Sequence, residues 1–98
     1  MDLEIKKELN DTVLTVSAIG RINSITAPEL ENTLKESYDS VSKIILDFKD
    51  LEYISSAGLR VVLAAYKAMN GNLVVRNSSK GVMEVFEMTG FTNIVTFE

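Results

Sequence analysis

The sequence contains no histidine, no cysteine and no tryptophan, and it has only one proline among 98 residues. Without histidine and cysteine, the usual general base at neutral pH and the usual thiolate nucleophile are both missing. Serine–histidine and cysteine–histidine catalysis are therefore excluded, and a structural zinc site lacks its ligands. Glycine-rich phosphate-binding motifs of the GxxxxGK[ST] and GxGxxG kinds are also absent. We therefore expect a protein that is not an enzyme and holds no cofactor.

Long hydrophobic runs and clusters of positive charge are missing too. The longest apolar run near the middle, Val61 to Tyr66, is far shorter than the roughly 20 residues that cross a bilayer. The segment after Met1 lacks the basic start and apolar core of a secretory signal. Acidic residues outnumber basic ones by 14 to 10, which disfavours binding to nucleic acid phosphates. We expect residues 1–98 to form one cytoplasmic domain with no membrane and no nucleic acid partner.

Hydrophobic periodicity predicts an alternation of strands and helices. In chain order, we expect a hairpin of two strands (Leu3 to Leu9 and Thr12 to Ile19), a helix from Thr26 to about Ser40, a strand from Lys43 to Phe48, a helix from Ser56 to Asn70, a strand from Leu73 to Arg76, a helix capped by Ser79 and ended by Gly90, and a last strand from Ile94 to Phe97. This order implies right-handed crossovers in a mostly parallel sheet, and hence an α/β fold.

Local sequence patterns predict how one of these helices begins and which face of another is buried. Thr26 and Glu29 have the spacing of a capping box, and Ile25 and Leu30 have the spacing of a hydrophobic staple. In the helix after Ser79, the apolar positions predicted to face inward are Val82, Val85, Phe86 and Met88.

An acidic segment follows the predicted strand that ends at Phe48. Because apolar residues occupy both faces of that strand, we expect it to be more buried than an edge strand. Asp50 and Glu52 are predicted to lie in a solvated loop, and Asp47 needs a partner or an exposed crevice. The alternative is that these three carboxylates gather around a hard cation such as Mg²⁺.

Two serines, Ser55 and Ser56, then open the next predicted helix. Functional sites in parallel α/β sheets tend to lie beyond the carboxyl ends of the strands, where this loop lies. One serine is enough to cap a helix, so the second hydroxyl is left over. Local sequence alone favours plain capping. The alternative is a phosphorylation site, because free N–H groups and the helix dipole favour a dianion at this end.

Three segments of the chain resemble the STAS domain family of bacterial anti-sigma factor antagonists. They are Gly20 to Leu30, Ile44 to Leu59 and Phe86 to Phe91, and they occur in the family's order over most of the chain. The resemblance implies a single α/β domain with a small mixed sheet and its helices mainly on one face. It also implies partner switching, in which the unmodified antagonist binds an anti-sigma factor serine kinase, phosphorylation ends that binding, and a serine phosphatase reverses it.

The resemblance also assigns the site residues. It aligns Ser55 to Leu59 with the family's Asp-Ser-Ser/Thr-Gly-Leu motif, which makes Ser56 the phosphate acceptor. The predicted partner-binding residues are Asn23, Ser24, Thr26, Asp47, Ser55, Ser56, Ala57, Gly58 and Arg60. No metal ligand and no catalytic residue is implied.

The chain departs from the family motif at three positions, Asn23, Ser55 and Ala57, and Ser55 remains a second candidate acceptor. Two other functions stay open from the sequence. The first is a STAS module that serves as a scaffold in a transport or stress-sensing assembly. The second is a small-ligand or nucleotide binder that uses a pocket around Asn23, Asp47 and Ser56. Many relatives continue into a last amphipathic helix beyond the position of Glu98, so some surface there is expected to be less covered.

Overall fold

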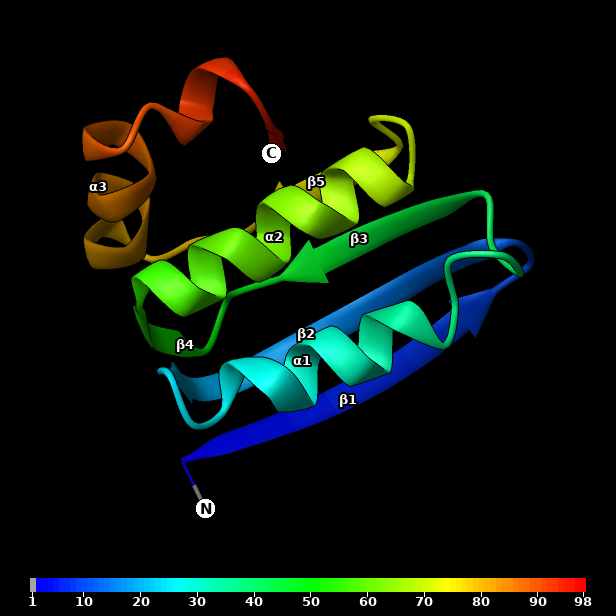
Figure 1. Cartoon of the computed structure of the whole chain (residues 1–98), viewed down its shortest axis with the longest axis horizontal. Coiled ribbons are helices and arrows are strands. Elements are labelled where there is room, and N and C mark those ends of the chain that lie inside the picture. Colours follow the sequence, from blue (N-terminus) through cyan, green and yellow to red (C-terminus); the bar gives the residue numbers. More distant parts are fainter. Residues whose placement is uncertain (1) are drawn as a thin grey trace.

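Residues 2–98 form one mixed six-stranded sheet with three α-helices packed against one of its faces (Figure 1). The computed structural model describes residues 2–98. The elements are β1 (Leu3–Asn10), β2 (Val13–Ile22), α1 (Ala27–Lys35), β3 (Lys43–Asp47), β4 (Leu51–Ile54), α2 (Ser56–Ala68), β5 (Leu73–Arg76), α3 (Lys80–Met88), a 3₁₀ turn η1 (Phe91–Asn93) and β6 (Thr96–Phe97). The strand order is β1-β2-β3-β5-β6, with β4 also paired to β2, and only the β1–β2 pair is antiparallel. The predicted α/β class is confirmed.

Strand β2 is longer than the sequence predicted, because it continues past Ile19 to Ile22. The register of its pairing with β4 shifts between Gly20 and Arg21. Gly20 has a φ of 110°, and a Cβ there would collide with the carbonyl oxygen of Asp2. This bulge lets the second half of β2 pair with a different neighbour from the first half.

The largest correction concerns β4, which the sequence predicted to be a loop. Leu51 and Ile54 are buried while Glu52 and Tyr53 are exposed, so the segment lacks the strict alternation that marks a strand. Residues 51–54 form a strand because their backbone groups pair in parallel with those of β2. The chain therefore runs along β2 twice, first as β3 and then as β4, before it enters α2.

Helix α1 ends at Lys35 instead of near Ser40, and residues 36–40 form turns. The N–H of Ser37 donates to the carbonyl oxygen of Leu34 at 3.0 Å, three residues back, which tightens the end of the helix. The predicted capping box and staple at its start are also wrong. Thr26 makes no side-chain cap bond to the helix, and Ile25 is 81% exposed.

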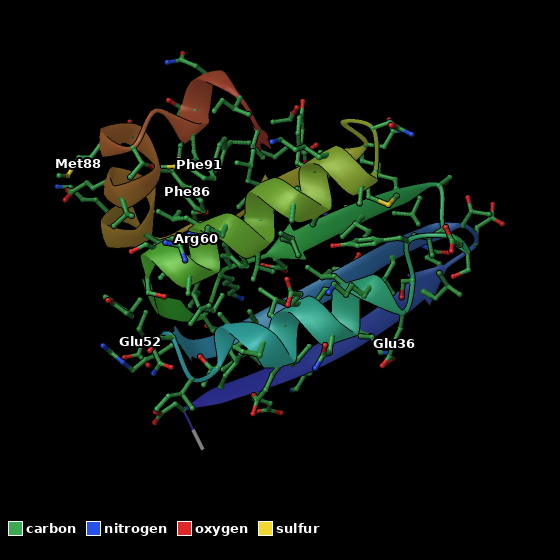
Figure 2. All side chains as sticks on the ribbon, in the orientation of Figure 1. Glu36, Glu52, Arg60, Phe86, Met88 and Phe91 are labelled. Carbon is green, nitrogen blue, oxygen red and sulfur yellow. The ribbon has the colours of Figure 1, made fainter. Side chains whose placement is uncertain are left out.

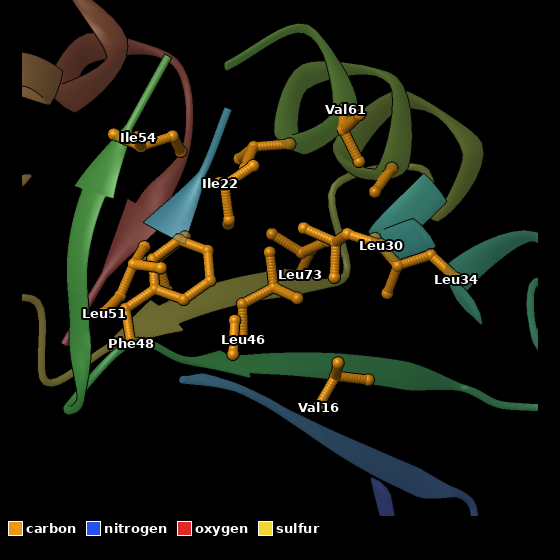
Figure 3. Packing of buried hydrophobic residues seen from close by; sticks show 14 of the residues in the cluster. Val16, Ile22, Leu30, Leu34, Leu46, Phe48, Leu51, Ile54, Val61 and Leu73 are labelled. Carbon is orange, nitrogen blue, oxygen red and sulfur yellow. The ribbon is translucent and has the colours of Figure 1, made fainter. Parts of the chain in front are cut away.

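The core lies between the sheet and the helices, where side chains from β2, β3, β5, α1 and α2 converge (Figure 3). Helix α3 adds Val82 and Phe86 to this core, and Ser79 caps it as predicted by accepting from the Val82 N–H at 3.3 Å. Met88, however, is 86% exposed and points away from the core, contrary to the prediction. The last strand is shortened to Thr96–Phe97. Over residues 2–98, every helix is too short or too polar to cross a membrane.

Candidate functional site

The two serines at the start of α2 have different structural roles. Ser55 is the N-cap residue: its backbone is extended, and its hydroxyl oxygen accepts a hydrogen bond from the Gly58 N–H at 3.3 Å. Its own N–H donates to the carbonyl oxygen of Ile22 at 2.8 Å, which ties the cap to β2. Ser56 is the first helical residue and is exposed. Capping is therefore done by Ser55, and the Ser56 hydroxyl is left to solvent.

Gly58 holds the start of α2 close to the sheet. It is buried, and a Cβ at this position would lie 2.7 Å from side-chain carbons of both Ile22 and Ile54. These two residues are paired neighbours on β2 and β4. The glycine thus allows the helix to approach the strand pair.

The loop from Asn23 to Thr26 is held by hydrogen bonds from its own side chains. The Asn23 Oδ1 accepts from the N–H groups of Ile25 and Thr26, each at 2.9 Å. Thr26, which is 5% exposed, donates its hydroxyl to the carbonyl oxygen of Arg21 at 2.9 Å and accepts from the Asn23 N–H at 2.9 Å. Asn23 therefore accepts from the Thr26 N–H, the donor that Glu29 would have satisfied in a capping box.

A shallow groove of about 320 Å³ runs between α1 and α2, which lie side by side over the sheet (Figure 1). It is lined by Ser24, Ala27, Pro28, Glu31, Ala57, Arg60, Val61 and Ala64. Most of these side chains are small, and Glu31 and Arg60 supply the charges. Arg60 is exposed near the start of α2, one helical turn after Ser56 (Figure 2).

Asp47 lies on a different surface. Its Oδ1 accepts from the Lys49 N–H at 3.0 Å and from the Asn77 side-chain amide at 3.4 Å. It lines a pocket with Lys6, Ser17, Ile19, Lys49 and Asp50. Because residues alternate across a strand and Leu46 belongs to the helix-covered core, Asp47 faces away from α1 and α2. The structure does not join Asp47 to the groove that Ser24, Ala57 and Arg60 share.

The alternative of a cation site receives no support. Within residues 2–98, no three or more acidic, histidine or cysteine side chains gather as a metal-binding group. Glu52 lines a neighbouring surface pocket, which shares Lys49 and Asp50 with the Asp47 pocket and extends to Ser79 beside the start of α3.

Sequence reasoning missed two features of this surface. The first is the extent of the groove: Ala57 and Arg60 were predicted, but Ala64 was not, although it follows Arg60 by four residues on the same helix face. The second is the exposed side chain of Ile25, which had been assigned to a staple. The staple pattern was followed in its place, although Asn23 can accept hydrogen bonds from the N–H groups two and three residues ahead, as it does here.

Comparison with known proteins identifies the family. The model of the STAS domain matches residues 4–98, and the chain belongs to this family. BtrV of Bordetella bronchiseptica, provisionally named an anti-sigma factor antagonist, is 41% identical over 88 residues, which cover 86% of this chain and 76% of BtrV.

Solved structures show the same fold. An anti-sigma factor antagonist from Mycobacterium paratuberculosis superposes with a TM-score of 0.89 at 24% identity, over 97% of this chain and 84% of that one. The anti-sigma factor antagonist SpoIIAA superposes at 0.84 in its unphosphorylated form and at 0.77 in its phosphorylated form, with 18% and 17% identity. Those matches cover 97% of this chain and 88% and 91% of the SpoIIAA chains.

Proposed function

We propose that this protein is an anti-sigma factor antagonist that works by partner switching, with Ser56 as the phosphate acceptor. The unmodified chain binds an anti-sigma factor that is also a serine kinase, and this binding frees a sigma factor in the cytoplasm. Transfer of the ATP γ-phosphoryl group to the Ser56 hydroxyl ends the binding, and a serine phosphatase restores it. The chain itself carries out no catalysis in this cycle.

The observation that carries the proposal is the division of roles between the two serines. Ser55 is partly buried and its oxygen is engaged as the cap, whereas Ser56 is exposed at the first position of the helix. A kinase can reach the Ser56 oxygen without removing a helix cap. Ser56 is therefore favoured over Ser55 as the acceptor. The names of the relatives support the proposed role of the chain, since BtrV and SpoIIAA are both named anti-sigma factor antagonists.

The start of α2 can accommodate a phosphate without unfolding. The first N–H groups of a helix have no acceptor within it, and the helix dipole places positive potential there. The Gly58 N–H already donates to Ser55, so those of Ser56 and Ala57 remain for phosphate oxygens. Arg60 follows Ser56 by four residues and so lies on the same face of the helix. We expect the phosphorylated chain to keep its fold.

Phosphate acts as the off-signal through its position on the proposed docking face. That face comprises the Asn23–Thr26 loop, the start of α2 and the α1–α2 groove, where Glu31 and Arg60 supply the charges. A phosphoserine adds about −1.5 to −2 charges and a bulky group to this face. An interface loss of about 3 kcal/mol would weaken binding more than a hundredfold, which is enough for regulation. Asp47 lies on the other side of the sheet and has no part in this mechanism.

The test uses the purified full chain, ATP and each serine-kinase anti-sigma factor of the same organism. We expect mass spectrometry to find one added phosphoryl group on Ser56, with none on the Ser56→Ala variant and continued labelling of Ser55→Ala. In calorimetric titrations, Ser56→Ala should bind like the wild type and Ser56→Asp should bind much more weakly. Labelling of Ser55 in place of Ser56, or equal affinities of the two Ser56 variants, would contradict the mechanism.

A further inference from the structure

Ile25 is 81% exposed, although an isoleucine is among the most costly side chains to leave in water. It precedes the N-cap residue of α1, a position where an apolar side chain ordinarily packs against the fourth helical residue. That residue is Leu30, which is fully buried among other side chains. Single exposed apolar residues are common in soluble proteins and need no explanation by themselves. The way in which Ile25 is held sets it apart.

Hydrogen bonds fix the backbone on both sides of this side chain. The Asn23 Oδ1 accepts from the N–H of Ile25 and from the N–H of Thr26, both at 2.9 Å. Thr26 is in turn anchored by its hydroxyl to the carbonyl oxygen of Arg21. Because isoleucine is β-branched, its first side-chain torsion is stiff once the backbone is fixed. The side chain is therefore held outward before any partner arrives.

The surroundings of Ile25 indicate what kind of surface it meets. Its neighbour Ser24 lines the α1–α2 groove together with Ala57 and Arg60, so Ile25 stands at the edge of the proposed docking face. The segment Asn23–Thr26 carries no charge. The partner surface that contacts Ile25 is therefore apolar. Glu31 and Arg60 supply the charges of the docking face farther along the groove.

We infer that Ile25 is a preorganised apolar anchor of the docking face, and that the anti-sigma factor provides an uncharged apolar pocket for its side chain. This inference rests on the proposed function. It adds an uncharged residue that helps to determine the affinity for the anti-sigma factor. A fixed anchor loses little conformational freedom on binding, so most of the gain from its burial appears as affinity. Ile25 then strengthens binding to the anti-sigma factor, and phosphorylation of Ser56 prevents that binding.

The experiment compares Ile25→Ala with the wild type in binding to the purified anti-sigma factor. We expect binding to weaken by about 10- to 100-fold, the factor for withdrawing one large aliphatic side chain from a buried contact. The change should appear mainly as faster dissociation. Ile25→Val, which keeps the branched shape, should retain most of the affinity. The matched control is Leu9→Ala, because Leu9 is 61% exposed in the β1–β2 hairpin, at the end of β2 remote from this loop. It should bind within about twofold of the wild type.

The outcomes separate this inference from the proposed function. If Ile25→Ala binds like the wild type while Ser56→Asp is weakened, the anchor is overturned and partner switching stands. If Ile25→Ala is weakened and Ser56→Asp is not, the anchor stands and the phosphate switch fails. If neither variant changes the affinity, or if the wild type binds no anti-sigma factor of its organism, both ideas are overturned.

Discussion

The rings of Phe48 and Phe86 stack nearly parallel, with 4° between their planes and 6.3 Å between their centroids. They join the end of β3 to helix α3. Phe86 also contacts the rings of Phe91 and Phe97, with centroids at 5.9 and 4.8 Å. This aromatic cluster packs α3 and η1 against the sheet, through Phe48 after β3 and Phe97 in β6.

Replacing Phe86 with alanine should be among the most damaging single changes. The side chain is fully buried, so Phe86→Ala is expected to lower the free energy of unfolding by about 3–5 kcal/mol, measured by urea denaturation. The matched control on the same helix is Met88→Ala, which should change it by less than about 0.5 kcal/mol because Met88 is 86% exposed. Similar effects of the two variants would contradict the packing described for α3.

Gly58→Ala tests the close approach of α2 to the sheet. A methyl group would lie 2.7 Å from side-chain carbons of Ile22 and Ile54, so we expect a loss of about 1–3 kcal/mol from overpacking. The control is Gly81→Ala in α3, where a methyl group meets no atom within 4 Å. That change should instead stabilise the protein by about 0.5–1 kcal/mol, because alanine favours the helix. Thermal unfolding of both variants checks the signs.

The roles of the two serines predict different stability effects when each is replaced by alanine. Ser55→Ala removes the cap of α2 and should cost about 1 kcal/mol, which lowers the melting temperature by roughly 4–8 °C in a domain of this size. Ser56→Ala should leave stability within about 0.5 kcal/mol of the wild type, since its hydroxyl is exposed. A larger loss for Ser56→Ala would mean that the capping assignment is reversed.

The places of the candidate residues along the strands and helices were partly predictable, but their arrangement in space was not. Ser56 at a helix start followed from the two adjacent serines and the apolar stripe after them, and the structure places it there. The family resemblance grouped Asp47 with Asn23 and Ser56 among the predicted partner-binding residues. The side chain of Asp47 faces the opposite side of the sheet, since strand alternation puts Leu46 in the core and Asp47 outside it.

The α/β class, the antiparallel hairpin, the three helices and the cap of α3 could be predicted, because they depend on periodicity and on residues near one another in the chain. The strand at Leu51–Ile54, the end of α1 at Lys35 and the exposure of Ile25 became apparent in the folded chain. Each of these outcomes is set by interactions that local periodicity does not encode. A strand without strict alternation forms only when a neighbour pairs with its backbone, and a side chain points outward when other residues fix the chain around it.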